Sequence, residues 1–255
     1  MQIHGSTILV TGASGGLGAA MARDLHARGA SLVLSARNVD VLDALAAELD
    51  AEVIVADLSD RADVERLAAR AATCDILVAN AGVGNDGALD ELTEQAIDFA
   101  LDVNLRAPIV LSHAFARAKI DAGKPGQIVL VGSLAGMAAT PGSRMYNATK
   151  FGLRGFALSF AQELEDTDVA CALVAPGFIR DAGMFHDGGI ELPSGVRTKS
   201  PEDVAEGVVK AITKDVTEVF VSPAELRIAT TLATVAPGLA NTLQRKLGVT
   251  ELQND

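Results

Sequence analysis

Short runs of aliphatic and β-branched residues alternate along the chain with longer segments whose apolar residues recur at helical spacing. This alternation is typical of repeated strand–helix–strand units. The first strand is expected at Thr7–Val10, and a glycine-rich turn follows it. The later strands are expected at Ser31–Ser35, Val53–Ala56, Asp75–Ala79, Gln127–Val131, Val169–Val174 and Glu218–Val221.

Helices are expected between these strands, where alanine and leucine repeat every three or four positions. They are expected near Gly16–Arg28, at Val39–Leu49, from a cap at Asp60 to Ala72, at Thr93–Ile120 with a bend at Pro108, and at Arg144–Leu164. Crossovers between parallel strands are almost always right-handed, which puts helices on both sides of the sheet. The pattern therefore predicts an α/β fold of three layers, a doubly wound Rossmann sheet of about seven parallel strands with helices on both faces.

Two segments lie outside this alternation. Residues 178–200 are rich in glycine and carry scattered apolar side chains, which indicates a loop that covers the substrate. The tail from Ala224 to Leu247 is amphipathic to apolar and is interrupted at Pro237-Gly238. It could pack on the core, complete a subunit interface or touch a lipid-like surface. We expect one domain over residues 1–222, which includes the loop, and an apolar extension over residues 223–255.

Composition narrows the class of protein. The net charge of −12 argues against DNA or RNA as a partner. Cys74 and Cys171 lie far apart in apolar surroundings and are expected to be reduced thiols, with no metal site. The first residues lack the basic start and apolar core of a signal peptide, and Pro141 and several glycines interrupt the uncharged run at 126–143. We expect a soluble, cytoplasmic protein without a transmembrane segment.

A glycine-rich segment directly follows the first strand and opens the first helix. Glycines let the backbone approach a phosphate closely, and the start of a helix offers N–H groups and a favourable dipole. The spacing is Gly-x-x-x-Gly-x-Gly, which differs from the commoner Gly-x-Gly-x-x-Gly fingerprint. A tight turn without a ligand is the alternative. The expected nucleotide contacts here are Thr11, Gly12, Ser14, Gly15, Gly16, Leu17 and Gly18.

The residue that follows the second strand bears on the choice of cofactor. An NAD-binding protein usually has a carboxylate there for the ribose 2′-hydroxyl group. This chain has Arg37 in that region, and its guanidinium group can bind a 2′-phosphate through charge-assisted hydrogen bonds. A solvated surface arginine is the alternative. NADP(H) is therefore favoured, and NAD(H) stays open.

The chain contains a single tyrosine, Tyr146, and Lys150 follows it four positions later. On a helix these two side chains share one face. A free phenol titrates near pH ~10, and a nearby cation favours the phenolate and brings the pKa closer to neutrality. The pair by itself is also compatible with a half-buried aromatic residue beside a solvated lysine.

Seven motifs occur in an order that resembles the compact, single-domain branch of the short-chain dehydrogenase/reductase family. The resemblance covers about residues 5–222. The motifs are Thr11–Gly18, Asp57-Leu58, Asn80-Ala81-Gly82, Asn104, Ser133, Tyr146-x-x-x-Lys150 and Pro176-Gly177. Each motif is weak alone, but the complete ordered set is specific.

The resemblance implies a catalytic role for four residues. Ser133 would hold the carbonyl oxygen of the substrate, and Tyr146 would give a proton to that oxygen or remove it. Lys150 would lower the pKa of the tyrosine and bind the nicotinamide ribose. Asn104 would hold a water molecule that links Lys150 to solvent.

The resemblance also implies contacts with the cofactor and the substrate. Asp57 would bind the adenine amine with Leu58 alongside, although it could instead cap a helix. Asn80, with Ala81 and Gly82, would steady the sheet beside the cofactor, or Asn80 could be an ordinary turn residue. Pro176 and Gly177 would form the wall next to the nicotinamide. Ile179-Arg180-Asp181 departs from the Val-x-Thr common in the family, and Ile179 is expected to contact the cofactor. The expected substrate contacts are Ser133, Tyr146, Phe178, Met184 and Phe185.

These observations predict an NAD(P)(H)-dependent oxidoreductase that prefers NADPH. It would reduce a ketone or aldehyde to an alcohol, or run in reverse, on an apolar substrate that includes fatty or lipid-linked carbonyls. The alternative is a nucleotide-binding regulator or scaffold without turnover. By resemblance the protein is expected to form a homodimer or homotetramer, and its tail could make peripheral contact with a membrane.

Overall fold

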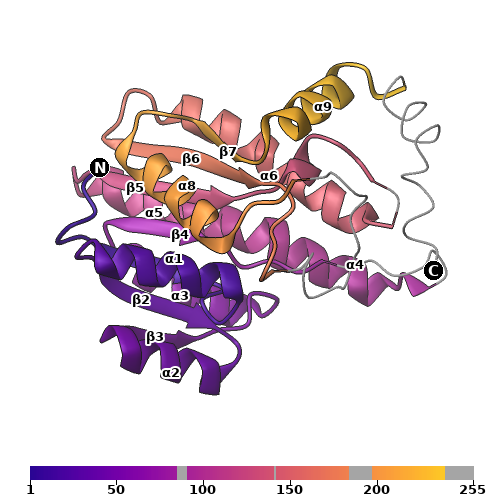
Figure 1. Ribbon diagram of the computed structural model, residues 1–255. Helices are drawn as coiled ribbons and strands as arrows, with labels where there is room; N and C mark the ends of the chain where they lie inside the picture. Colours follow the sequence, from indigo (N-terminus) through magenta and orange to yellow (C-terminus); the bar gives the residue numbers. More distant parts are fainter. Residues whose placement is uncertain (85–90, 141, 184–196, 239–255) are drawn as a thin grey trace.

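The computed structural model describes residues 1–84, 91–140, 142–183 and 197–238. Its strands form one parallel sheet in the order β3-β2-β1-β4-β5-β6-β7, which confirms the expected architecture (Figure 1). The order reverses between β1 and β4, and such a switch point is where α/β sheets bind ligands. The strands are β1 (Thr7–Thr11), β2 (Ser31–Ala36), β3 (Glu52–Val55), β4 (Ile76–Ala79), β5 (Gly126–Val131), β6 (Val169–Pro176) and β7 (Glu218–Val221).

Helices cover both faces of this sheet. On one face lie α1 (Gly16–Ala27), α2 (Val39–Leu49) and α8 (Pro201–Thr213). On the other face lie α3 (Arg61–Ala71), α5 (Ala107–Asp121) and α6 (Arg144–Glu163). Each face is apolar because the strands are buried on both sides, so successive residues serve different cores.

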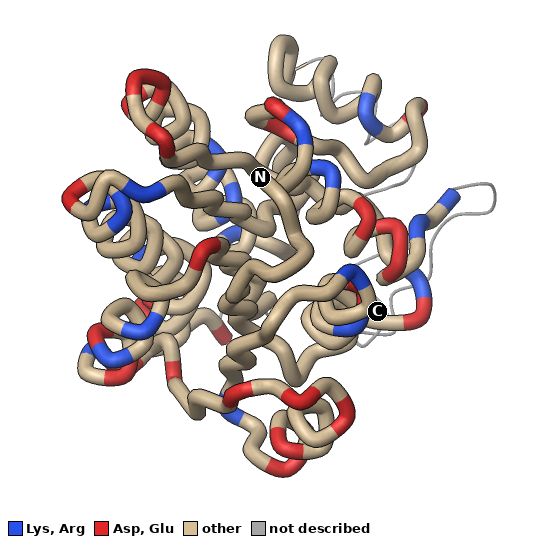
Figure 2. The backbone as a smooth tube through the Cα atoms, turned by 90° about the vertical axis from the view of Figure 1, so that its left-hand side faces the viewer, with Lys and Arg blue, Asp and Glu red and all other residues tan. Residues whose placement is uncertain are grey.

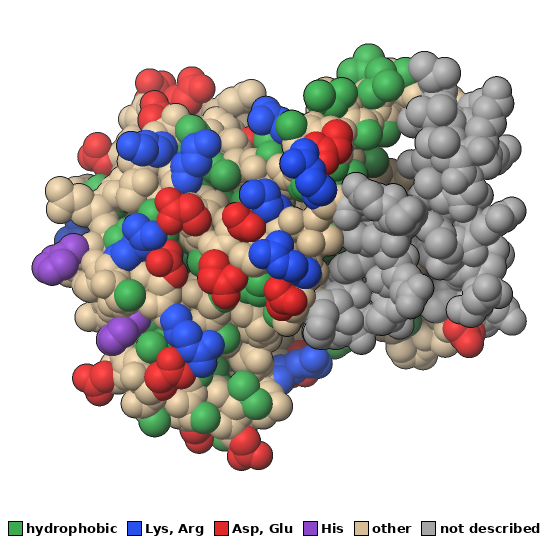
Figure 3. Space-filling view, viewed as in Figure 1, with side chains coloured by type: hydrophobic (Ala, Val, Ile, Leu, Met, Phe, Trp, Pro, Cys, Tyr) green, Lys and Arg blue, Asp and Glu red, His purple; other side chains and the backbone are tan. Residues whose placement is uncertain are grey.

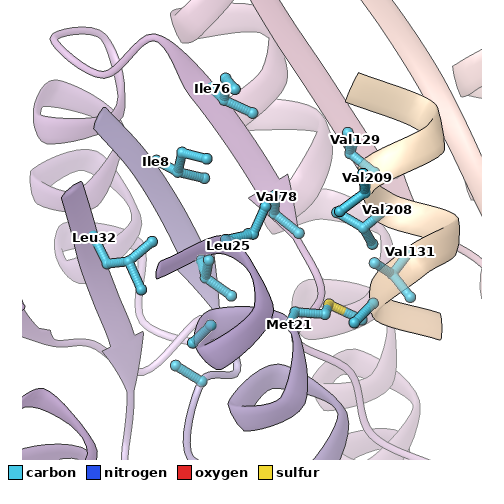
Figure 4. Packing of buried hydrophobic residues seen from close by; sticks show 14 of the residues in the cluster. Ile8, Met21, Leu25, Leu32, Ile76, Val78, Val129, Val131, Val208 and Val209 are labelled. Atoms are coloured by element: carbon cyan, nitrogen blue, oxygen red, sulfur yellow. The ribbon is translucent and has the colours of Figure 1, made fainter. Parts of the chain in front are cut away.

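The two cores follow the two-residue period of the strands. Ile8 and Val10 of β1 pack under α1, whereas Leu9 points to the opposite face, and all three side chains are fully buried. Figure 4 shows the first core, where Met21 and Leu25 of α1 lie over the sheet. This packing fixes the distance of α1 from the sheet, and thereby the position of the glycine-rich turn at the start of the helix.

The two edge strands carry charge, unlike the central strands. β3 begins with Glu52, which pairs with Arg70 of α3 at 2.7 Å. β7 begins with Glu218, which accepts hydrogen bonds from two nitrogens of Arg154 on α6, at 2.6 and 3.0 Å. Charged residues otherwise lie mainly on the outer helices and loops (Figure 2). Charge at the edges discourages pairing with a further strand and ties each edge to a covering helix.

The long helix expected at 93–120 is interrupted at residues 102–106, just before Pro108. Helix α4 (Glu94–Leu101) passes into a π-helix, η2 (Asp102–Arg106), and α5 begins only at Ala107. Proline has no N–H group to offer the carbonyl of Asn104, so the ladder is already broken there. A wider turn before the proline absorbs that break and holds Asn104 inside the protein at 1% exposure.

Helices α8 and α9 follow the loop region. Helix α8 was not predicted, although Ser200 and Asp203 form a complete capping box at its start. α9 (Ala224–Val235) lies in the expected amphipathic tail and exposes Ile228, Leu232 and Val235. Asp60 caps α3 as expected. Cys74 and Cys171 are free and buried.

Candidate active site

The predicted site residues lie where the strands end, at the carboxyl edge of the sheet. Thr11 ends β1, Arg37 follows β2, Asp57 follows β3 and Asn80 follows β4. Ser133 comes directly after β5 and Gly132, and Pro176 ends β6. Parallel strands bring these positions together at the switch point, although more than 160 residues separate the first from the last.

The glycine-rich turn fits a phosphate group. Helix α1 starts after Gly15 without a side-chain cap and has no acidic residue in its first turn. By contrast, side chains cap α2, α3, α4 and α8. A Cβ atom on Gly18 would lie 2.2 Å from the carbonyl oxygen of Gly12, so only glycine lets the turn close this tightly. The N–H groups at the start of α1 are thus suited to an anion.

A short network joins the ends of β1 and β4 across the switch point. The side-chain oxygen of Thr11 accepts hydrogen bonds from the backbone N–H groups of Asn80 and Ala81, at 3.0 and 3.1 Å. The Asn80 amide donates to the carbonyl oxygens of Thr11 and Gly12, at 3.0 and 3.3 Å. Gly12 has φ = +67° and lies against Ala81. Asn80 therefore fastens the turn to the sheet, a structural position compatible with its expected role.

The segment after β6 folds back over the glycine-rich turn. A Cβ atom on Gly16 would lie 2.4 Å from the Cβ of Ala182, and Gly183 lies beside Leu17. Ile179 is buried, and its bridge to Lys199 brings the two described ends of the expected covering loop together. Asp181 has φ = +68° and its carboxylate lies 3.2 Å from Arg180. The departure from Val-x-Thr thus puts a strained, exposed acidic residue in this segment.

Arg37 lies beside the other residues expected at the adenosine end. Its guanidinium group is 4.0 Å from the carboxylate of Asp57 and lies 5.5 Å from the ring centroid of Phe99. The arginine side chain is 58% exposed, so it is free to meet a ligand from solvent. Asp57 does not cap α3; it accepts hydrogen bonds from the backbone and hydroxyl groups of Ser59 at 2.9 and 2.8 Å. Leu58 is buried beneath.

Ser133 and Tyr146 meet through their side chains. Ser133 precedes a short 3-10 helix, η3 (Leu134–Gly136), and its hydroxyl oxygen accepts the N–H of Ala135 at 3.1 Å. The same hydroxyl group hydrogen-bonds the Tyr146 side chain. Burial raises the pKa of the Tyr146 phenol above its ordinary value, and the Ser133 hydrogen bond opposes this in part.

Lys150 lies one helical turn after Tyr146 and is 3% exposed. Its ammonium group donates to the carbonyl oxygen of Val131 at 2.9 Å and lies 5.7 Å from the ring centroid of Tyr146. Burial lowers the pKa of Lys150 to about 8. We expected Lys150 to lower the pKa of Tyr146. In the protein without cofactor the pKa of Tyr146 is raised instead, because desolvation of the phenol outweighs the hydrogen bond from Ser133.

Asn104 belongs to a buried network on the far side of Lys150. Its side-chain oxygen accepts the N–H of Val83 at 2.7 Å, and its amide donates to the Val83 carbonyl oxygen at 2.7 Å. The amide also donates to the hydroxyl oxygen of Thr149 at 3.2 Å, and that hydroxyl donates to the Tyr146 carbonyl oxygen at 2.9 Å. The π-helix is thereby tied to the turn of α6 that carries Tyr146.

Two residues that the sequence analysis did not single out, Asn147 and Thr149, organise this turn. Both are buried polar side chains within the helix that carries Tyr146 and Lys150. The available signal was their type, since polar residues with short side chains are poor helix formers and need a reason to be buried inside one. The partners of Asn147 lie only 7 to 12 residues earlier in the chain, but they belong to the irregular segment before the helix, and Asn104, a partner of Thr149, lies 45 residues away.

The substrate side of the site is partly within the described residues. Phe178 follows the Pro176-Gly177 wall, whereas Met184 and Phe185 lie outside the described residues. Helix α9 reaches this wall, because a Cβ atom on Gly177 would lie 3.1 Å from a methyl group of Leu226. The hydroxyl group of Thr234 donates to the carbonyl oxygen of Met137 at 2.8 Å. Helix α9 therefore packs beside the Pro176-Gly177 wall, where the substrate is expected.

Within residues 1–84, 91–140, 142–183 and 197–238, no group of three or more histidine, cysteine or acidic side chains is arranged to hold a metal ion. Across the same residues, no helix has the length and apolar character needed to cross a bilayer.

Comparison with known proteins gives the family. The family model for short chain dehydrogenases matches residues 6–189. The chain is 39% identical over 187 residues to nodulation protein G of Rhizobium sp. (strain N33), which covers 71% of this chain and 76% of that protein. It is 34% identical over 182 residues to the 3-oxoacyl-[acyl-carrier-protein] reductase FabG of Rickettsia bellii (strain RML369-C), covering 71% and 75% respectively.

A solved structure extends the similarity over nearly the whole fold. The short-chain dehydrogenase from Sphingobium yanoikuyae in complex with NADPH superposes with a TM-score of 0.80 at 27% identity, covering 92% of this chain and 95% of that one. The fold, the ordered motifs and these matches lead to one conclusion. The chain belongs to the short-chain dehydrogenase/reductase family and is an NAD(P)-dependent oxidoreductase.

Proposed function

We propose that this protein is an NADPH-preferring carbonyl reductase, reversible as an alcohol dehydrogenase, for apolar carbonyl compounds that include fatty or lipid-linked ones. The observation that carries the proposal is the meeting of the Ser133 and Tyr146 hydroxyl groups beside buried Lys150. When bound, the cofactor supplies or accepts the hydride, and the protein supplies position and charge.

The protein's own groups would then handle the oxygen and its proton. Ser133 would hold the carbonyl oxygen, and the Tyr146 hydroxyl group would donate a proton to it during reduction. Lys150 is a cation within reach of the Tyr146 ring, which favours the phenolate that remains after this transfer. The Asn104–Thr149 network would hold the backbone of α6 so that these two side chains keep their geometry.

The preference for NADPH is supported by Arg37. Its exposed guanidinium group lies at the end of β2, where a ribose 2′-phosphate would be bound in this fold. Its ion pair with Asp57 is long, at 4.0 Å, which leaves the arginine available for a phosphate. The residues proposed to hold the rest of the cofactor are the glycine-rich turn, Leu58, Asn80-Ala81-Gly82, Pro176-Gly177 and Ile179.

The apolar substrate class is supported by two features. A FabG protein named for a 3-oxoacyl-[acyl-carrier-protein] substrate is a relative at 34% identity. In addition, the wall of the site carries apolar side chains, because Leu226 of α9 and Leu134 both lie against Gly177. An acyl chain would find favourable surroundings along such a wall.

Tyr146→Phe tests the proposed chemistry, because it removes one oxygen atom and leaves the ring. Ketone-dependent oxidation of NADPH should fall by at least about a hundredfold, while the affinity for NADPH stays within about threefold. Undiminished turnover would overturn the role of Tyr146. A panel of 3-oxoacyl thioesters, aliphatic ketones and the corresponding alcohols should be tried with both cofactors, and binding without turnover across it would favour the regulator or scaffold.

Assembly and surroundings also belong to this proposal. Homodimers or homotetramers are usual among symmetric oligomers. Apolar side chains gather on the outer face of α9 (Figure 3), where Ile228 is 69%, Leu232 46% and Val235 79% exposed. This face supports a subunit contact or a peripheral membrane contact by the extension 223–255. Size-exclusion chromatography with light scattering, and flotation with anionic vesicles, separate these outcomes when Ile228→Ser is compared with the unaltered protein.

The proposal also includes the location of the protein in the cell and its division into domains. Two buried, free cysteines agree with a reducing compartment such as the cytoplasm. A domain over residues 1–222 predicts that truncation after Ser222 leaves the strands of the sheet intact, which far-UV circular dichroism and thermal melting would test.

A further inference from the structure

Asn147 directly follows Tyr146 on α6, yet its side chain points away from solvent and is 6% exposed as a residue. Its amide donates to the carbonyl oxygens of Ala135 and Ala138, at 2.9 and 3.2 Å. Its side-chain oxygen accepts the N–H of Thr140 at 3.1 Å. All three bonds go to the backbone of residues 135–140, the segment that follows Ser133.

Together with Ser133, these contacts form a closed ring. The Tyr146 and Ser133 hydroxyl groups share a hydrogen bond. The Ser133 oxygen accepts the N–H of Ala135, whose carbonyl oxygen accepts the Asn147 amide. Asn147 returns to Tyr146 through the peptide bond. Ala135 is thus held at both ends of its backbone, once by Ser133 and once by Asn147.

Residues 135–140 also pack closely against two helices, so their position depends on the hydrogen bonds from Asn147. The backbone at Gly136 approaches α6 so closely that a Cβ atom there would lie 2.6 Å from the Lys150 carbonyl oxygen. From the other side, Thr234 of α9 donates to the Met137 carbonyl oxygen. The segment is therefore held between the catalytic helix and the tail helix, and Asn147 supplies the side-chain contacts from the catalytic helix.

We propose that Asn147 is a positioning residue that holds the Ser133 hydroxyl group against Tyr146, and that it acts through the backbone of Ala135. A buried amide with three backbone partners fixes both the distance and the rotation of the segment. Catalytic groups lose much of their effect when they are displaced by an ångström. This inference rests on the proposed proton transfer at Ser133 and Tyr146, but its geometry can be tested without turnover.

Tyr146 gives that test, because the chain has one tyrosine and no tryptophan. Tyrosinate absorbance and the carbon chemical shift of the phenol Cζ atom therefore report Tyr146 alone, in protein without cofactor or substrate. Lys150, whose ammonium group lies 5.7 Å from the Tyr146 ring centroid, is left unaltered in every variant. Ser133→Ala should raise the midpoint of tyrosinate formation, since the Ser133 hydrogen bond lowers it.

Asn147→Ala should move the midpoint and the chemical shift in the same direction as Ser133→Ala, by about half a pH unit or more. In the Ser133→Ala background, Asn147→Ala should add no further shift, because its effect passes through Ser133. Carbonyl reduction should lose about tenfold to a hundredfold in kcat with a smaller change in KM. Gln127→Ala is the control, since Gln127 is also a buried amide but lies at the opposite end of β5, where its amide donates to the Ile128 carbonyl oxygen.

An unchanged Tyr146 signal in Asn147→Ala, or an equal shift with and without Ser133, would overturn the proposal. If Asn147→Ala does not fold, the same measurements are made on Asn147→Ser. The serine side chain is shorter than that of asparagine and cannot reach the carbonyl oxygens of Ala135 and Ala138 together, so the same shift of the Tyr146 signal is expected. If the variants show the expected Tyr146 shifts but the unaltered protein reduces no carbonyl compound, the positioning role of Asn147 stands and the proposed function is refuted.

Discussion

Gly136 lies against Lys150 so closely that an added Cβ atom would come within 2.6 Å of the Lys150 carbonyl oxygen. The neighbour is backbone, which cannot move aside as a flexible side chain would. We therefore expect Gly136→Ala to push η3 away from α6 and to lower carbonyl reduction by at least about tenfold.

Gly155 provides the control for that substitution. It lies in the same helix α6 as Lys150, and a Cβ atom there would meet nothing within 4 Å. Gly155→Ala should keep full activity and raise the free energy of unfolding by about 0.5–1 kcal/mol, because alanine favours the helix. Steady-state kinetics and urea denaturation check both variants, and equal activity in the two would contradict the close approach.

The burial of Lys150 should make the free energy of unfolding depend on pH. Its pKa is about 8 in the folded protein and 10.5 is its ordinary value. Below pH 8 the folded protein bears the full cost of the buried charge, and between these two values the unfolded chain binds more protons, so stability rises with pH. Lys150→Met should therefore be more stable than the unaltered protein at pH 7.

That advantage of Lys150→Met should shrink by roughly 2 kcal/mol as the pH rises from 8 to 10. Other groups titrate in both proteins and cancel in the difference. The raised pKa of Tyr146 acts in the opposite sense, but only above the ordinary phenol value of about 10. Guanidinium denaturation at a series of pH values measures the effect, and a difference that does not vary with pH would exclude it.

Arg37 should decide between the two dinucleotides. Arg37→Ala removes the proposed partner of the 2′-phosphate, so the affinity for NADP⁺ should fall by about tenfold to a hundredfold while that for NAD⁺ stays within about twofold. Calorimetric titration of each cofactor gives both values. Arg66→Ala, which removes an exposed arginine paired with Asp63 at 2.6 Å, is the control. A parallel loss of both affinities in Arg37→Ala would assign Arg37 to structure alone.

The Arg154–Glu218 pair should contribute more to stability than a similar pair at the surface. Its side chains are 24% and 15% exposed, and it joins α6 to the edge strand β7. Arg154→Met should lower the free energy of unfolding by about 2–3 kcal/mol, because Glu218 is left without its partner. Arg197 and Glu225 have the same two-bond geometry at 71% and 54% exposure, so Arg197→Met should cost at most about 0.5 kcal/mol. Equal costs in thermal or urea unfolding would show that burial of the first pair is unimportant.

The order of the strands and helices could be predicted because it depends on local patterns. Each central strand, such as Ile8–Val10, is an uninterrupted apolar run, and buried parallel strands require this. The glycine-rich turn was also readable, since its conformation depends on residue type within eight positions. The π-helix was not predicted, because Pro108 signals a break in the ladder of hydrogen bonds but does not indicate how the preceding turn absorbs it.

The sequence by itself determined the parallel sheet and the glycine-rich turn, because periodicity and residue type are local properties of the chain. Ser133, Tyr146 and Lys150 became candidates through the ordered motifs that resemble the short-chain dehydrogenase/reductase family. Tertiary structure decided what surrounds them. Burial raised the pKa of Tyr146 and lowered that of Lys150. The spacing of residues along the chain does not indicate how deeply a side chain is buried, so these shifts could not be predicted from it. Folding also brought Asn147 onto the segment after Ser133, because the path of residues 135–140 back to α6 decides which backbone groups the buried amide meets.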